Sequence, residues 1–113
     1  MKIVTKSQRE EFKHNDDCVI YEYSMDDKAI DGCIVKLSGR YPQKGFAINT
    51  VSKEMAYVIA GSGKVTVEGK EYDISEGDAM LINPNEKFYW QGTMELFIPC
   101  TPAWRVEQYK VIE

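Results

Sequence analysis

Short runs of β-favouring residues, separated by turn signals about every 8–12 residues, constrain this sequence more than any other feature. Such spacing is typical of a β-sandwich or a β-barrel, and no stretch of helix length carries an apolar period near 3.6 residues. The sequence therefore predicts an all-β fold. The runs occupy residues 18–23, 33–37, 46–51, 55–60, 64–67, 71–74, 79–82, 88–90, 95–98 and 104–112.

Turn-forming residues punctuate these runs. The glycines of residues 61–63 allow positive φ at two backbone positions. Residues 68–70 lie between two alternating runs, which predicts a β-hairpin with Gly69 at the strained position. Residues 75–78 and 83–86 are rich in Gly, Asn, Asp and Pro and indicate two further turns.

The length, composition and charge of the chain indicate one globular domain and limit the partners that it can bind. With 113 residues, 43% apolar and 28% charged, it suits one domain with a single core. Residues 1–17 are polar, and we interpret them as a tether, a short helical turn or an edge strand, with the β domain spanning 18–113. The net charge is −4 and the basic residues are scattered, which argues against nucleic-acid binding. No apolar run has the length of a signal-peptide core or a membrane span, which favours the cytoplasm without membrane association.

Three cysteines and one histidine need an interpretation. Cys18, Cys33 and Cys100 are odd in number, far apart and without a C-x-x-C pair, so we predict reduced thiols, partly buried in strands. His14 lies in the polar leader, where we expect a solvated surface residue.

Two linked motifs lie in the middle of the chain. Glu54 is followed, after six intervening residues that include Tyr-Val-Ile, by Gly61; a hairpin pattern spans residues 63–74; and Glu-Gly-Asp at residues 76–78 leads to a proline turn. This combination resembles the cupin family. The resemblance implies a double-stranded β-helix, a jelly-roll barrel. Asn85 stands where the family has glycine, and asparagine tolerates left-handed backbone well, so we expect the turn to persist.

The resemblance also implies a metal site whose ligands this chain has lost. By the family spacing, the metal-binding histidines fall on Ala47, Asn49 and Phe88, and only Glu54 keeps a ligand position. Alanine and phenylalanine cannot coordinate a metal, and an amide oxygen suits a transition metal poorly. The remaining groups fall short of the three or four protein ligands that such metals need. We therefore expect neither a metal nor another cofactor.

The inward positions of the motif strands form the candidate site. The resemblance implies that Asn49, Glu54 and Phe88 lie on the inner face of the barrel, and alternation along the strands adds Val51, Ala56, Val58 and Trp90 to the same face. We predict ligand-binding roles for Asn49, Glu54, Tyr57, Phe88 and Trp90, and we expect Tyr41, Phe46, Tyr89 and Trp104 near the opening.

Structural alternatives exist for each main candidate. Phe88 and Trp90 would, in the alternative, fill the space that the metal site left, since a small barrel can be closed by side chains. Glu54 would be a carboxylate paired with a buried donor, rather than a ligand contact or a proton-transfer group with a raised pKa. Asn49 would be a satisfied amide in the barrel wall.

Three functions are compatible with these residues. The favoured hypothesis is a metal-independent cupin that binds a small polar molecule, sugar-like or carboxylate-like, in the barrel. The second is a metal-independent isomerase or epimerase; enzymes of that type with a cupin fold use a histidine base and a tyrosine acid, whereas here Glu54 would act with Tyr57, Tyr89 or Tyr41. The third is a structural or dimerisation module with a filled barrel. We leave the catalytic residues unassigned.

We further expect a homodimer. The apolar runs at residues 19–23 and 104–112 lie near the two ends of the chain and are predicted at sheet edges. Exposed edges carry unpaired backbone groups and seek partners.

Overall fold

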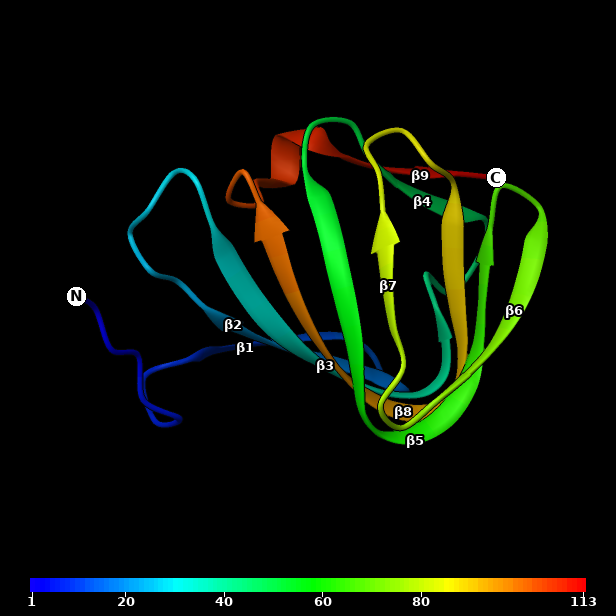
Figure 1. Ribbon diagram of the computed structural model, residues 1–113, viewed down its shortest axis with the longest axis horizontal. Helices are drawn as coiled ribbons and strands as arrows, with labels where there is room; N and C mark the ends of the chain where they lie inside the picture. Colours follow the sequence, from blue (N-terminus) through cyan, green and yellow to red (C-terminus); the bar gives the residue numbers. More distant parts are fainter.

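The computed structural model describes residues 1–113, which form nine β-strands and one 3₁₀ turn (Figure 1). All strand pairs are antiparallel. The predicted all-β fold is therefore confirmed. The elements are β1 (Glu10–Asn15), β2 (Cys18–Tyr23), β3 (Asp31–Tyr41), β4 (Phe46–Asn49), β5 (Lys53–Val67), β6 (Lys70–Ser75), β7 (Ala79–Ile82), β8 (Phe88–Thr101), η1 (Val106–Gln108) and β9 (Tyr109–Ile112).

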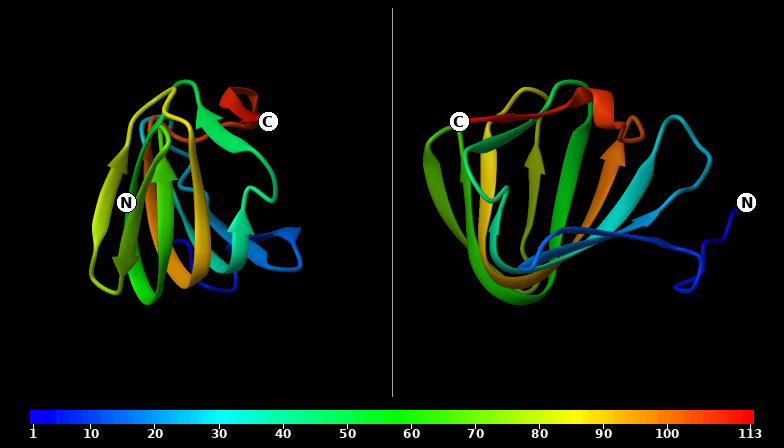
Figure 2. Two further views of the ribbon diagram at one scale, coloured as in Figure 1. Left: turned by 90° about the vertical axis from the view of Figure 1, so that its right-hand side faces the viewer. Right: turned by 180° about the vertical axis from the view of Figure 1, so that it is seen from behind.

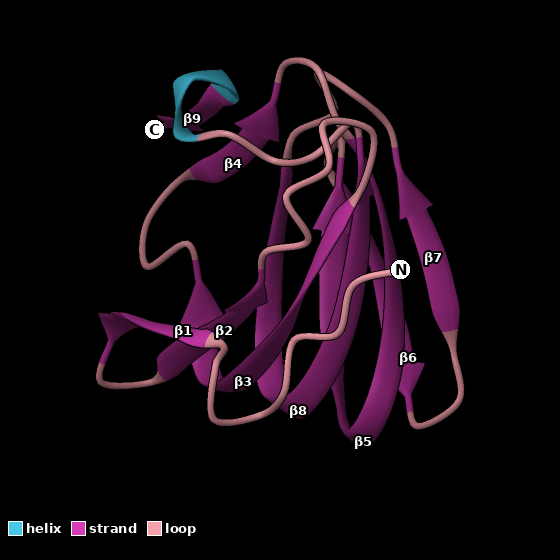
Figure 3. Cartoon of the chain, turned by 90° about the vertical axis from the view of Figure 1, so that its left-hand side faces the viewer, coloured by secondary structure: helices cyan, strands magenta, loops and turns pink.

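The sheet curls around the two longest strands. β5 and β8 pair along most of their length, and both bend strongly, which brings the remaining strands up on either side (Figures 1 and 2). One path through the sheet runs β1-β2-β3-β8-β4-β9, while β5 also pairs with β6 and β7. The segment of residues 102–112, here called the C-terminal arm, crosses the end of the curled sheet opposite the bend, beside β4 (Figure 3).

Glycines let β5 and β8 approach closely at the bend. A Cβ atom at Gly61 would lie 2.2 Å from the Thr93 carbonyl oxygen, and one at Gly63 equally close to that of Gln91. Gly61 has φ of +84°, a conformation that side chains disfavour. The prediction of separate strands at 55–60 and 64–67 is wrong. These glycines lie within one continuous strand, β5, and let it pair closely with β8 at the bend.

The two predicted turns with strained backbone are confirmed. Residues 68 and 69 join β5 to β6 with positive φ at both positions, +49° at Glu68 and +80° at Gly69. That is the backbone of a tight hairpin whose twist matches its strands. Asn85 has φ of +67° in the turn before β8, so asparagine does replace glycine there.

The N-terminal segment contributes a strand. β1 pairs antiparallel with β2, which in turn pairs with β3. Of the three alternatives for residues 1–17, the structure has an edge strand at Glu10–Asn15. The edge predicted at residues 19–23 is wrong, because β1 covers that side of β2. β9, by contrast, pairs with β4 alone and lies at an edge.

Alternation along the strands places the core inside the curl. Ala56 and Val58 of β5 and Leu96 of β8 are completely buried and belong to the main apolar cluster. The intervening residues of β5 are exposed on the outer face. Val51, expected inside, is 56% exposed, because the chain turns between β4 and β5 and breaks the alternation there.

All three cysteines lie in strands of the sheet. Cys18, Cys33 and Cys100 are free thiols in β2, β3 and β8, as predicted, and Cys18 and Cys100 are fully buried. No helix in the chain has the length and apolar character needed to cross a membrane.

Candidate functional site

The curled sheet encloses an open pocket of about 480 Å³. This volume lies within the range of small-molecule sites in proteins. Phe88 and Trp90 of β8 form part of its wall and are almost fully buried. They line the pocket and do not fill it, so the alternative of a barrel closed by side chains is not what the structure has.

Glu54, at the start of β5, is held by a chain of hydrogen bonds. The Asn49 amide donates to Glu54 Oε1 at 2.6 Å, and the Trp104 indole donates to Asn49 Oδ1 at 2.9 Å. Asn49 is 3% exposed and does not itself line the pocket. The indole thus sets the orientation of the amide, and the amide leaves Glu54 Oε2 free to face the pocket.

Burial raises the pKa of Glu54 to about 7. The hydrogen bond from Asn49 opposes this shift, and the charge of Asp31 adds to it. No lysine, arginine or histidine forms an ion pair with Glu54. The alternative of a carboxylate paired with a buried donor is therefore met in part, since the buried Asn49 amide is that donor and no cationic side chain is. At neutral pH the group lies close to half protonation, which suits both proton donation and proton acceptance.

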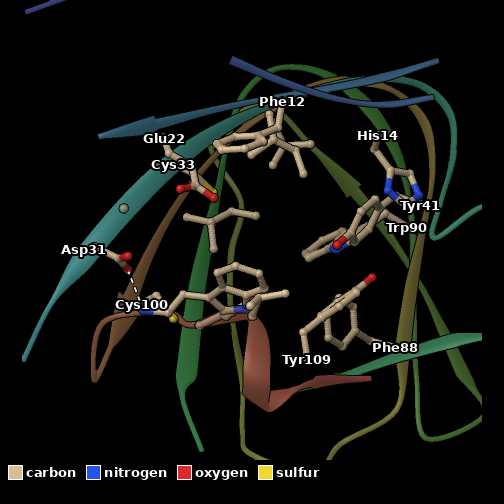
Figure 4. A pocket seen from close by; sticks show the side chains of 17 residues that line it. Phe12, His14, Glu22, Asp31, Cys33, Tyr41, Phe88, Trp90, Cys100 and Tyr109 are labelled. Carbon is tan, nitrogen blue, oxygen red and sulfur yellow. Dashed lines mark hydrogen bonds between the residues drawn. The ribbon is translucent and has the colours of Figure 1, made fainter. Parts of the chain in front are cut away.

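Two more carboxyl groups line the same pocket. Burial raises the pKa of both Glu22 and Asp31, and for Glu22 the nearby charge of Asp31 adds to the effect. Asp31 accepts a hydrogen bond from the Trp104 backbone N–H at 3.1 Å. Figure 4 shows Glu22 and Asp31 on one side of the pocket, opposite His14 and Tyr41. We call Glu22, Asp31 and Glu54 the acidic side.

Aromatic rings form a second wall, which runs from the side opposite Glu22 and Asp31 to Trp104, next to Asp31. His14 lies 4.6 Å from Tyr41, Tyr41 lies 6.5 Å from Tyr109, and Tyr109 lies 5.9 Å from Trp104, measured between ring centroids. Burial raises the pKa of both tyrosines and lowers that of His14, which favours neutral rings throughout this wall. The hydroxyl of Tyr109 is buried without a hydrogen-bond partner. We call these four residues the aromatic wall.

The structure brings together most of the predicted site residues. Glu54, Phe88 and Trp90 line the pocket, and Asn49 supports Glu54 from behind. Tyr57 does not belong to this site: its side chain is 43% exposed on the outer face of β5. Its odd spacing from Glu54 along a strand decides this, because neighbouring positions alternate between faces.

The residues expected near the opening divide into two pairs. Tyr41 and Trp104 line the pocket. Phe46 and Tyr89 do not; their rings pack against each other at 5.4 Å, with the Arg40 guanidinium over Tyr89 at 4.0 Å. An acid–base role for Tyr89 or Tyr57 together with Glu54 is therefore excluded by position.

Several pocket residues were not predicted from the sequence. Glu22 follows Cys18 and Ile20 at intervals of two, so its inward position was readable from alternation. His14 is exposed, as predicted, but β1 also places it in the pocket lining, where its ring packs at a tilt against Tyr41. No local pattern indicates the others, which reach the pocket through strand register and the C-terminal arm: Phe12, Asp31, Cys33, Cys100, Val106 and Tyr109.

The pocket offers no cluster for a metal ion. No three His, Cys, Asp or Glu side chains of the chain lie close enough together to coordinate one. The family's ligand positions are occupied by Ala47 and Phe88, both buried apolar residues, and by Asn49, whose amide is committed to Trp104 and Glu54.

Comparison with known proteins places this geometry in a family. A family model described as a cupin domain matches residues 42–96. No curated protein sequence matches the chain. Among the most similar solved structures is a nucleoside dehydratase from Streptomyces, also solved with uridine, with a TM-score of 0.90 and 18% identity over 100% of this chain and 92% of that chain.

Two further structures show the same fold. KdgF from Halomonas has a TM-score of 0.76 at 14% identity, covering 95% of this chain and 97% of its own. The ectoine synthase of P. lautus has a TM-score of 0.69 at 15% identity, covering 91% of this chain and 80% of its own. At these identities the likeness shows a shared fold. Together with the cupin-domain match over residues 42–96, it shows that this chain has the cupin fold, a double-stranded β-helix barrel.

Proposed function

We propose that this cupin binds a small, hydroxyl-bearing organic molecule without negative charge, of nucleoside type, in a metal-independent pocket. The observation that carries the proposal is a pocket with three carboxyl groups, an aromatic wall and no lysine or arginine among its lining residues. Carboxylates accept hydrogen bonds from hydroxyl groups, and flat rings stack on aromatic side chains.

The same charges argue against part of the earlier hypothesis. A carboxylate-like or phosphorylated ligand would meet Glu22, Asp31 and Glu54 with no cationic side chain to offset them. Like charges at this range in a partly dehydrated site repel strongly. The sugar-like alternative therefore remains and the carboxylate-like one is set aside. The likeness to a nucleoside dehydratase solved with uridine supports a ribose-bearing ligand of this size.

Binding of uridine tests the proposal. Isothermal titration should give a measurable affinity for uridine and at least about tenfold weaker binding of uridine 5′-monophosphate, the same molecule with a negative charge. Trp104→Ala should weaken uridine binding, whereas Tyr57→Ala, on the outer face, should leave it unchanged. Equal or tighter binding of the monophosphate would contradict the proposal.

Acid–base catalysis on the bound molecule is the second candidate. It is favoured by the position of Glu54, whose pKa of about 7 and free oxygen suit proton transfer, in one pocket with the hydroxyls of Tyr41 and Tyr109. Removal of a proton from a carbon next to a carbonyl and its return to that carbon need no cofactor. Incubation of candidate keto-sugars or nucleoside aldehydes in D₂O, followed by NMR, should show deuterium uptake with the wild type and a loss of at least about a hundredfold in Glu54→Gln.

A further inference from the structure

We infer that the acidic side of the pocket is a subsite for a protonated amine, so that the preferred ligand of this cupin is an organic cation. The inference rests on the proposed function, because it takes the barrel pocket as the ligand site, and it adds the charge and the place of one functional group. Three observations carry it: strand register, uncompensated charge and the aromatic wall.

Strand register places two carboxyl groups on either side of a small residue. Asp31 of β3 is opposite Cys100 of β8, and Cys100 is opposite Glu54 of β5. Neighbouring strands lie about 4.8 Å apart, so the two carboxylate-bearing positions are separated by roughly 10 Å of sheet with only a cysteine side chain between them. Glu22 of β2 is opposite Cys33, two residues from Asp31 on the same face, and brings the third carboxyl group to the same end of the pocket.

No group of the chain balances these carboxylates. None of the four ion pairs of the structure includes Glu22, Asp31 or Glu54. Asp31 accepts one backbone N–H and Glu54 accepts one amide N–H, which leaves most of their acceptor positions unused. Burial of carboxylates without a partner costs free energy, and a bound cation would offset that cost.

The aromatic wall distinguishes an organic cation from a metal ion. A hard cation such as Ca²⁺ needs six or more oxygen ligands, and the acidic side does not form a cluster of that kind. An ammonium group with its carbon chain needs fewer oxygens and gains from ring faces nearby. Tyr41, Tyr109 and Trp104 supply those rings, and Trp104 lies next to the acidic side, where its backbone N–H bonds Asp31.

Three ligands with one skeleton and three charges test the inference. We use uridine, 5′-amino-5′-deoxyuridine and uridine 5′-carboxylate, measured by isothermal titration at neutral pH. The amine should bind at least about tenfold more tightly than uridine, and the carboxylate should bind most weakly. An amine that binds no more tightly than uridine overturns the inference while the proposed function stands. Absence of binding by all three compounds overturns both.

Variants locate the subsite. Asp31→Asn and Glu22→Gln together should abolish most of the preference for the amine over uridine, because amide side chains retain the hydrogen-bonding shape without the charge. Glu95→Gln removes a carboxylate from the outer face of β8 and should keep the full preference. An amine preference that survives the double substitution would place the cation elsewhere and overturn the assignment. Circular dichroism confirms that each variant is folded.

Discussion

The two faces of β5 each depart from the usual distribution of polar and apolar side chains. On the inner face Glu54 leads, followed by the completely buried Ala56 and Val58. On the outer face Met55 and Tyr57 are exposed by 51% and 43%. The inner face therefore carries an unpaired ionisable group, while the outer face presents apolar side chains to water.

This difference shows that strand register, and not hydrophobicity, decides which residues serve the pocket. Alternation along the strand is strict, and a residue one position away from Glu54 is on the other side of the sheet. An unpaired buried carboxylate is costly, and exposed large apolar side chains often mark a surface that contacts another protein. We therefore expect the inner face to serve a ligand and the outer face to serve association.

The largest expected effect comes from placing a charge on each face in turn. Val58→Asp puts a carboxylate into the completely buried core and should destabilise the fold by more than about 4 kcal/mol. Ile59→Asp, one residue further on, faces solvent and should cost less than about 1 kcal/mol. Urea denaturation measures both. Similar losses at the two positions would show that the two faces do not differ in the way described.

Glu54→Gln should stabilise the protein at alkaline pH. Burial raises the pKa of this carboxyl to about 7, so the folded state keeps a proton that the unfolded chain releases above its ordinary value of 4.5. The stability of the wild type therefore falls as pH rises through this window, and that of the variant does not. The difference should reach up to about 3 kcal/mol at about pH 8 and vanish near pH 4.

Chemical denaturation at several pH values checks this expectation. Glu95→Gln, on the outer face of β8, is the matched control and should not show the pH-dependent gain. A Glu54→Gln variant that is less stable than the wild type at every pH would mean that its carboxylate has a stabilising partner in solution.

The apolar outer face should support a homodimer. Met55 is paired with Leu81 and Tyr57 with Phe97, so four exposed apolar side chains adjoin one another across β7, β5 and β8. This patch now replaces the strand edge at residues 19–23 as the expected contact between two copies. Met55→Glu with Tyr57→Glu should weaken dimerisation at least about tenfold.

Light scattering at micromolar concentration measures the dimer. The patch is not involved in dimerisation if the double variant dimerises as well as the wild type, and a wild-type mass of 13.0 kDa would exclude the dimer altogether.

The smallest expected effect belongs to Tyr57→Phe. Because the side chain faces away from the pocket, loss of its hydroxyl should change ligand affinity by less than about twofold. Titration with uridine measures it, with Tyr41→Phe as the comparison from the aromatic wall. A clear loss at Tyr57 would restore it to the site.

The sequence allowed prediction of the fold because its evidence is local. Turn residues such as Gly69 and Asn85 have the positive φ that their positions demand, and alternation assigns the inner face of β5 correctly. The error at residues 61–63 has a physical cause. Glycine permits both a turn and a close approach between paired strands, and only the position of Thr93 on β8 distinguishes the two.

The site was predicted only in part, because half of it depends on contacts between distant segments. Glu54 and Phe88 follow from the ligand positions of the cupin motifs, and Trp90 follows from alternation. Asp31 joins Glu54 only through the pairing of β3 with β8 and of β8 with β5. Likewise, Trp104 donates a hydrogen bond to Asn49, 55 residues away in the sequence, and no local sequence pattern predicts this contact.

The composition of the pocket has a consequence for how such barrels diversify. The deep wall, with Glu54, Phe88 and Trp90, comes from the segment that matches the cupin domain model. Most of the other lining residues lie outside that segment, including His14 from β1 and Trp104 and Tyr109 from the C-terminal arm. Proteins that share the cupin barrel can therefore select different molecules through differences in these two terminal pieces.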